Sequence, residues 1–212
     1  MIDEGHIGVD ESGKGDYFGP LVIAACYVGP EHLAELEGVR DSKKLTDPVA
    51  LRLADQIKRH CPHSVIAIGP AKYNELYEKF RNLNRLLAWG HARAIENVLE
   101  QHPANLVISD QFADPAGLKR QLFEKGKTIE LRSVVRAEAD IAVAAASVLA
   151  RAEFLRKLKR LGDETGMPLP KGASQAVVDA AKRLVQKKGR ESLSQVAKLH
   201  FKTTQVVLGL SV

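Results

Sequence analysis

Acidic and glycine residues gather near the N-terminus, in the segment GVDESGKGDYFGP that runs from Gly8 to Pro20. Asp10 and Glu11 follow a short apolar run, which predicts a strand that enters the core. Neighbouring side chains of a strand point to opposite faces, so two adjacent carboxylates serve one site only where the chain turns. Hard divalent cations prefer carboxylate oxygens. The pair therefore indicates either a metal site at a strand end or two exposed acids in a turn.

The same segment fails two phosphate-binding patterns that it partly matches. Its glycines and Lys14 have the spacing of a phosphate-binding loop, but Gly15 stands where that loop needs Ser or Thr to ligate magnesium. The two acids inside such a loop would also repel phosphate. A dinucleotide-binding fingerprint fails too, because three residues rather than two separate Gly15 from Gly19, and the segment leads into a strand.

Further carboxylates that could complete a metal site come from distant parts of the chain. Asp110 follows the apolar run Leu106–Ser109, at the position where α/β sheets collect catalytic groups. Glu138 and Asp140 precede a helical pattern, where a carboxylate can instead cap the helix. A two-metal phosphodiesterase needs about three or four carboxylates around its ions. Four acids on separate elements, in a chain with a basic end, suggest a metal-dependent nuclease.

The elements that must position these acids alternate between β-type runs and helical patterns, which predicts an α/β fold with helices around a central mixed sheet. The apolar runs predict strands at 6–10, 21–28, 64–68, 106–109 and 129–135. Apolar spacing predicts a helix that starts at the N-cap Asp47 and two more helices at 83–99 and 141–158. After a break at 162–172, it predicts two further helices at about 174–188 and 191–199.

Charge is the unusual feature of the composition. The 212 residues have a net charge of +5, but residues 1–150 hold 18 Lys and Arg against 21 Asp and Glu, whereas residues 151–212 hold 13 against 5. We expect one catalytic domain over 1–212 with a basic helical subregion at about 162–212. The basic subregion indicates a polyanionic partner or a solvated lysine-rich surface.

Composition also excludes several classes of protein. No apolar run approaches the ~18–20 residues of a membrane span, and the first residues do not resemble a secretion signal. Two cysteines without a Cys-x-x-Cys motif argue against a disulfide scaffold and fit a reducing compartment. We therefore expect a cytoplasmic protein with no membrane partner.

Residues Val9–Leu21 resemble the opening motif of the type 2 ribonucleases H, and specifically that of ribonuclease HIII. Ribonuclease HII usually has arginine at the Lys14 position and lacks the Asp-Tyr-Phe triplet at 16–18. Further blocks match in the same order along nearly the whole chain, at Asp41–Leu45, Asn82–His91, Ser109–Asp110, Ala137–Arg151, Leu169–Ser174 and Ala197–Thr203.

The resemblance implies a ribonuclease H-like fold and an endonuclease that hydrolyses the RNA strand of RNA/DNA hybrids, leaving 5′-phosphate and 3′-hydroxyl ends. It implies two Mg²⁺ or Mn²⁺ ions in the active state, and no obligate protein partner, so we expect a monomer. The implied catalytic and metal-binding acids are Asp10, Glu11, Asp110 and Glu138, and Asp140 competes with Glu138 as the fourth acid.

Substrate binding is expected next to the first acids. Glycines at Gly13 and Gly15 let the backbone approach a sugar closely enough to sense a 2′-hydroxyl. The expected substrate-binding residues are Ser12, Gly13, Lys14, Gly15, Lys43 and Lys44, although a solvated surface explains the last two equally well.

Two departures from ribonuclease HIII and HII lead to further expectations. Ribonuclease HIII usually begins with a domain that resembles the TATA-box-binding protein; here the catalytic motif starts at residue 8, so we expect that domain to be absent. No tyrosine follows Tyr77, whereas ribonuclease HII uses a C-terminal tyrosine to recognise a single ribonucleotide in DNA. Three alternatives stay open: a ribonuclease HII-type enzyme that also cuts at single ribonucleotides, a non-catalytic nucleic-acid-binding protein, and a nucleotide hydrolase, which Gly15 disfavours.

Overall fold

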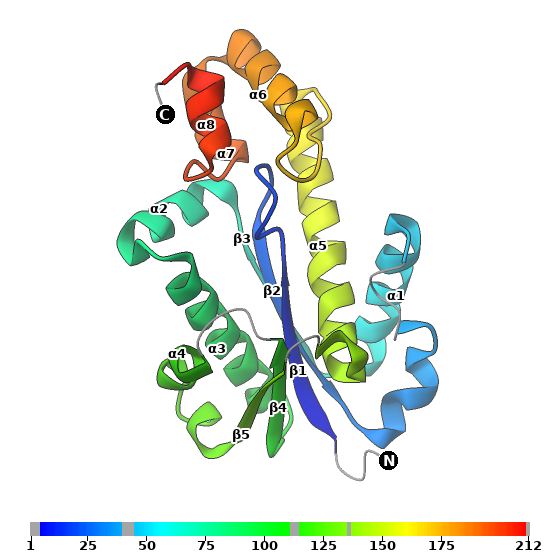
Figure 1. Ribbon diagram of the computed structural model, residues 1–212. Coiled ribbons are helices and arrows are strands. Elements are labelled where there is room, and N and C mark those ends of the chain that lie inside the picture. The colour runs from blue at the N-terminus through cyan, green and yellow to red at the C-terminus, as the bar shows by residue number, and fades with distance from the viewer. Residues whose placement is uncertain (1–4, 40–44, 111–114, 135–136, 211–212) are drawn as a thin grey trace. The chain divides into compact units, whose positions relative to one another are not determined.

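A computed structural model describes residues 5–39, 45–110, 115–134 and 137–210 of the chain (Figure 1). The chain divides into two compact units. The first comprises Met1–Glu11, Ile23–Ile66 and Asn82–Ala152, and the second comprises Ser12–Val22, Ala67–Arg81 and Glu153–Val212. All four acids expected at the catalytic site belong to the first unit.

Five strands form a mixed sheet in the order β3-β2-β1-β4-β5. Their bounds are His6–Ser12 (β1), Leu21–Val28 (β2), His63–Ile68 (β3), Leu106–Asp110 (β4) and Glu130–Val134 (β5). The strand β4 runs parallel to both β1 and β5. Every residue of β2 is buried, as its continuous apolar run predicts for a strand covered on both faces. The five predicted strands are therefore confirmed, with ends that differ by at most two residues.

Helices cover both faces of the sheet in the first unit. They are α1 (Asp47–His60), α3 (Leu83–Gln101), α4 (Pro115–Gln121) and the first half of α5 (Ile141–Thr165), with a 3₁₀ helix at Pro30–Leu36. In Figure 1, α3 and α4 lie on one side of β1 and β4, and α1 with the start of α5 lies on the other. The α3 side chains Leu86, Leu87 and Ile95 are fully buried, as are the alanines of α5 at 144–146.

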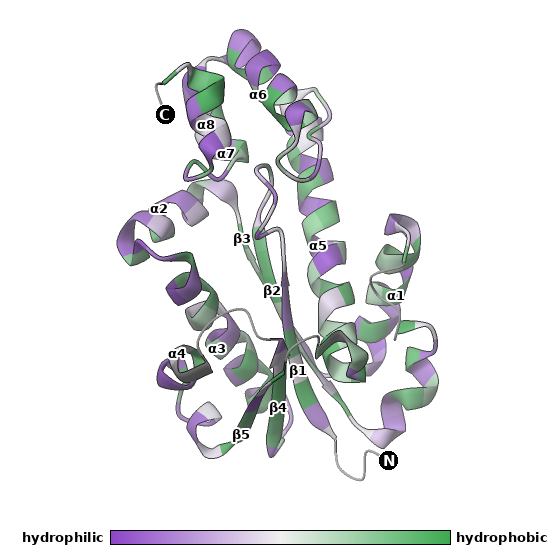
Figure 2. Cartoon of the chain, in the orientation of Figure 1, coloured by the Kyte–Doolittle hydropathy of each residue, from purple (hydrophilic) through white to green (hydrophobic). Residues whose placement is uncertain are grey.

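The second unit is mainly helical. Its helices are the second half of α5, α2 (Pro70–Phe80), α6 (Gln175–Lys188), α7 (Leu193–Val196) and α8 (Lys202–Leu208). Figure 2 shows hydrophilic and hydrophobic residues mixed along α6, which buries Val177, Ala181 and Leu184 and leaves lysines exposed. No helix in the described ranges is long and apolar enough to cross a membrane.

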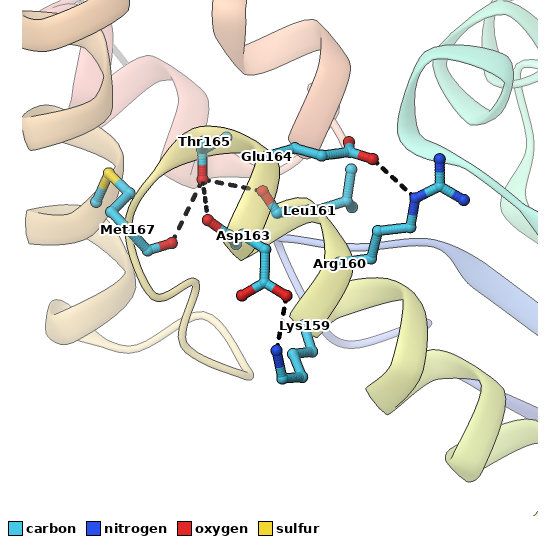
Figure 3. Close-up of polar contacts among 8 residues, drawn as sticks. Lys159, Arg160, Leu161, Asp163, Glu164, Thr165 and Met167 are labelled. Atoms are coloured by element: carbon cyan, nitrogen blue, oxygen red, sulfur yellow. Dashed lines mark hydrogen bonds and ion pairs between the residues drawn. The ribbon is translucent and has the colours of Figure 1, made fainter.

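The break predicted to begin at Gly162 is wrong, because α5 continues to Thr165. Figure 3 shows why its last turn holds. The ion pairs Lys159–Asp163 (2.6 Å) and Arg160–Glu164 (2.8 Å) join residues four apart on the helix. The Thr165 hydroxyl also lies 2.9 and 3.0 Å from the carbonyls of Leu161 and Gly162, so its single proton is shared between these helix-end acceptors.

Other boundaries differ in smaller ways. The N-cap of α1 is Thr46 rather than Asp47. The helix predicted at 191–199 is instead a 3₁₀ turn at Arg190–Ser192 followed by α7, because residue Ala197 leaves the helix to pair with Phe18 in an antiparallel bridge. Three helices, α2, α4 and α8, were not predicted.

Candidate active site

The parallel pairing of β1 with β4 brings two of the predicted acids together. Val9 lies opposite Ser109, so the same register continued by one residue places Asp10 beside Asp110. Neighbouring strands lie about 4.8 Å apart, and side chains in register point to the same face. Two carboxylates from residues 100 positions apart therefore meet where both strands approach their carboxyl ends.

Asp10 lies in a setting that disfavours its negative charge. Burial raises its pKa to about 6, and the neighbouring Glu11 carboxylate adds to the shift. Ser147, on α5, donates a hydrogen bond to the carboxylate and opposes the shift, as does His91 through its charge. A divalent cation at this position would offset the unfavourable charge of the Asp10 carboxylate.

Glu11 contacts a histidine on the side of β1 opposite to the side that Asp10 faces. Its side chain is 8% exposed, and its Oε2 lies 3.0 Å from Nε2 of the fully buried His91, on α3. The expected turn at the acid pair is wrong, because β1 continues through both residues to Ser12. Asp10 therefore contacts α5 while Glu11 contacts α3. The sequence pattern indicates no role for His91, although it ends one of the blocks that match ribonuclease HIII.

Asp110 lies next to the backbone that carries the fourth acid. Its Oδ1 accepts a hydrogen bond of 3.4 Å from the backbone N–H of Ala137, at the start of a 3₁₀ helix at Ala137–Ala139 that contains Glu138. The side chain of Glu138 lies outside the described part of the structure. Among the side chains that are described, no three His, Cys, Asp or Glu residues are grouped closely enough to hold a metal ion. A metal site here would therefore need Glu138 in addition to the strand acids.

Asp140, the competing assignment, is occupied elsewhere. Its Oδ1 accepts from the backbone N–H groups of Ala142 and Val143, at 2.9 and 3.0 Å, and so caps the N-terminus of α5. Its Oδ2 lies 2.8 Å from Nε2 of His6. Burial acts to raise the pKa of Asp140, but the hydrogen bonds from His6 and from the helix N-terminus keep it below its usual value. These contacts favour a structural role for Asp140.

A glycine sets the distance between β1 and α5. A Cβ atom at Gly8 would overlap the backbone of Ala142 and Val143. Only a residue without a side chain lets the strand pass directly against the first turn of the helix. This close approach fixes the backbone just after Glu138 against the strand that carries Asp10.

The predicted substrate-binding turn is described within the second unit. Gly13 is buried with φ of +86°, a conformation that favours glycine, and Lys14 and Gly15 are exposed. No heavy atom lies within 4 Å of a Cβ built at Gly15, so that position is open. Ser12 ends β1. Lys43 and Lys44 lie outside the described residues.

Comparison with known proteins identifies the family. A sequence model described as Ribonuclease HII matches residues 7–204. The chain belongs to this family. It is 48% identical over 206 residues to ribonuclease HIII of Protochlamydia amoebophila, which covers 96% of this chain and 68% of that protein. It is 47% identical over 209 residues to ribonuclease HIII of Chlamydia trachomatis serovar L2, which covers 96% and 69%.

Solved structures agree with the sequence comparison. Bst-RNase HIII in complex with Mn²⁺ superposes with a TM-score of 0.90 at 35% identity, over 98% of this chain and 70% of that one. Ribonuclease H2 from Pyrococcus horikoshii OT3, at 22% identity and a TM-score of 0.78, shares the fold. The resemblance to ribonuclease HIII, the ribonuclease H-like fold and the prediction of a nuclease that hydrolyses phosphodiesters are confirmed.

Proposed function

We propose that this ribonuclease H cuts the RNA strand of RNA/DNA hybrids with Mg²⁺ or Mn²⁺, and leaves 5′-phosphate and 3′-hydroxyl ends. The observation that carries the proposal is the in-register placement of Asp10 beside Asp110, next to the backbone of Glu138. The Mn²⁺ complex of Bst-RNase HIII supports a divalent metal in this family. We propose Asp10, Asp110 and Glu138 as catalytic acids that meet near the start of α5. Glu11, whose side chain contacts His91 of α3, is proposed as the fourth acid on the resemblance to ribonuclease HIII alone.

The donor set fits divalent metal ions of the hard class. All four side chains are carboxylates, and the pKa of Asp10 is raised to about 6 by burial and by Glu11, which a bound cation would reverse. When bound, two ions would lower the pKa of the attacking water and stabilise the leaving 3′-oxygen. The protein's own part is to hold the carboxylates: His91 fixes Glu11, Ser147 holds Asp10, and Ala137 holds Asp110.

Recognition of the substrate is proposed for the turn that follows β1. Lys14 and Gly15 are exposed, and no heavy atom lies within 4 Å of the position that a Cβ would take at Gly15. A ribose can therefore approach the backbone amide and carbonyl groups of this turn. We propose that Ser12, Gly13, Lys14 and Gly15 bind the RNA strand and that Lys43 and Lys44 bind phosphates. The net charge of +8 in residues 151–212 supports additional contacts with the duplex backbone.

The proposed activity predicts strand-selective cleavage. We expect the protein, with 5 mM Mg²⁺ or Mn²⁺, to cut an end-labelled RNA strand paired with DNA, and to leave a DNA duplex of the same sequence intact. The measurement is a denaturing gel, with phosphatase and ligase treatment to identify the ends. Cleavage of both duplexes, or undiminished cleavage in EDTA, would overturn the proposal.

The ribonuclease HII-type alternative is tested with the same assay. DNA duplexes that contain one, two or four consecutive ribonucleotides separate the two activities. Because no tyrosine follows Tyr77, we expect cleavage of the four-ribonucleotide substrate and little or none of the single one. Equal rates on the first and last substrates would favour the ribonuclease HII-type activity instead.

A further inference from the structure

A buried lysine holds the backbone of the glycine-rich segment in the second unit. Lys198 is 0% exposed, and its Nζ donates hydrogen bonds of 2.7 Å to the carbonyls of Asp16 and Gly19. The carbonyl of Phe18 lies 3.5 Å from the same atom. Three carbonyls within four residues thus point at one side chain that lies about 180 residues further along the chain.

The backbone around Lys198 strengthens the same connection. The Lys198 N–H donates to the carbonyl of Tyr17 at 2.9 Å, and the Gly19 N–H donates to the carbonyl of Val196 at 2.9 Å. These bonds form the antiparallel bridge between Phe18 and Ala197. The segment at 17–19 is therefore paired along one edge with residues 196–198. The Lys198 side chain also donates hydrogen bonds to carbonyls in and next to this segment.

A second segment fixes the same stretch from residue 172. The Gly172 N–H donates to Oδ1 of Asp16 at 2.6 Å, and the Tyr17 N–H donates to the carbonyl of Gly172 at 2.9 Å. The residues that immediately follow the Gly13–Gly15 turn are thus bound on two sides. The turn itself stays exposed at Lys14 and Gly15. The geometry of the Gly13–Gly15 turn depends on these hydrogen-bonded residues, because only Asp16 separates Gly15 from Tyr17.

We propose that Lys198 is a positioning residue for substrate selection, which fixes the Gly13–Gly15 turn in the conformation that senses the 2′-hydroxyl of the RNA strand. Lys198 does not touch substrate, since it is fully buried; it acts through the carbonyls of residues 16–19. The inference rests on the proposed function and names a residue on which its selectivity depends.

The chemistry of the site requires a lysine. Carbonyl oxygens only accept hydrogen bonds, and an ammonium group donates three, one for each carbonyl. Burial lowers the pKa of Lys198 to about 7, while the Asp16 carboxylate acts in the opposite direction. An apolar side chain of similar length would fill the space but leave buried carbonyls without donors.

The test replaces the ammonium and keeps the length. Lys198→Met is compared with Lys202→Met, an exposed lysine at the start of α8, which removes the same charge. Each protein is assayed on a hybrid and on the same hybrid with one 2′-deoxy nucleotide at the preferred cleavage site. Selectivity is measured as the kcat/KM for the intact hybrid divided by the kcat/KM for the hybrid with the 2′-deoxy nucleotide. We expect Lys198→Met to lower this ratio by about tenfold or more, and Lys202→Met to leave it unchanged.

A readout without substrate separates positioning from general destabilisation. Hydrogen–deuterium exchange of a peptide covering residues 12–22 should quicken in Lys198→Met, while peptides from α6 keep their wild-type protection. If Lys198→Met does not fold, Lys198→Gln, which keeps two N–H donors, is measured in the same way. An unchanged selectivity ratio in the folded variant would overturn the inference. A wild-type protein that does not cut the hybrid would overturn the proposed function instead.

Discussion

Asp10→Asn is expected to lower the rate of hybrid cleavage by at least about 10³-fold and, at the same time, to stabilise the metal-free protein. The activity falls because a ligand to the catalytic metal contributes several kcal/mol to transition-state stabilisation, and each 1.36 kcal/mol is about tenfold in rate. The measurement is single-turnover cleavage of labelled hybrid at saturating Mg²⁺. Asp55→Asn, a change at an exposed acid on α1, should cut at the wild-type rate.

The stability gain follows from the raised pKa of Asp10. Its folded-state pKa of about 6 lies above the ordinary value of 3.8, so the folded protein binds more protons than the unfolded chain between these pH values. Stability therefore falls as pH rises through this range, by roughly 3 kcal/mol when the carboxylate is fully ionised. Asparagine removes this cost, so the variant should exceed the wild type most clearly above pH 7 and little near pH 4.

Thermal unfolding in EDTA at pH 4.5 and pH 7.5 measures this effect. The expected result is a difference in Tm between Asp10→Asn and the wild type that grows with pH. A variant that is inactive and also less stable than the wild type at pH 7.5 would contradict this expectation, because its inactivity would then reflect damage to the fold rather than loss of a metal ligand.

Gly8→Ala is expected to destabilise the protein by about 3 kcal/mol, at the upper end of the cost of overpacking a core. A Cβ at this position overlaps the backbone of Ala142 and Val143, and backbone atoms cannot rotate away as a flexible side chain can. The first turn of α5 must shift away from β1. Because Glu138 precedes that turn and Asp10 follows Gly8, we also expect cleavage to fall in the folded fraction.

The matched control for this change is Gly15→Ala. No heavy atom lies within 4 Å of a Cβ at Gly15, so the free energy of unfolding of Gly15→Ala should stay within about 0.5 kcal/mol of the wild-type value. Urea denaturation, followed by circular dichroism, gives both values. Equal midpoints for the two alanine variants would show that β1 and α5 do not approach each other as closely as Gly8 indicates.

The strands were predictable because their sequences are short apolar runs between turn residues. The eight consecutive buried residues of β2 are the clearest case. The end of α5 was not, because a glycine at position 162 usually weakens a helix, whereas the ion pairs of Lys159 and Arg160 and the Thr165 hydroxyl extend it by a turn. The capping role of Asp140 was visible as an alternative in the sequence because it is local, whereas its contact with His6, 134 residues away, was not.

The proximity of the acids could not be derived from the sequence pattern alone. Asp10 meets Asp110 because β4 pairs with β1, and apolar runs do not specify strand order. The residue types suggested one metal site for both acids, and the resemblance to ribonuclease HIII supported it, but neither gave the strand order that joins them. His91 and Lys198 lie in blocks that match ribonuclease HIII, but the sequence pattern gave neither a role. A single buried histidine or lysine gains its meaning from the carboxylate or carbonyls that tertiary structure brings to it.

A metal centre at Asp10 and Asp110 is tested most directly by a Mn²⁺ titration followed by electron paramagnetic resonance, with four proteins compared at the same pH. We expect Asp10→Asn and Asp110→Asn each to weaken Mn²⁺ binding by at least about tenfold relative to the wild type. Asp140→Asn, which changes the helix cap, should bind Mn²⁺ as the wild type does. Wild-type affinity in both the Asp10 and Asp110 variants would contradict a metal centre at the carboxyl ends of β1 and β4.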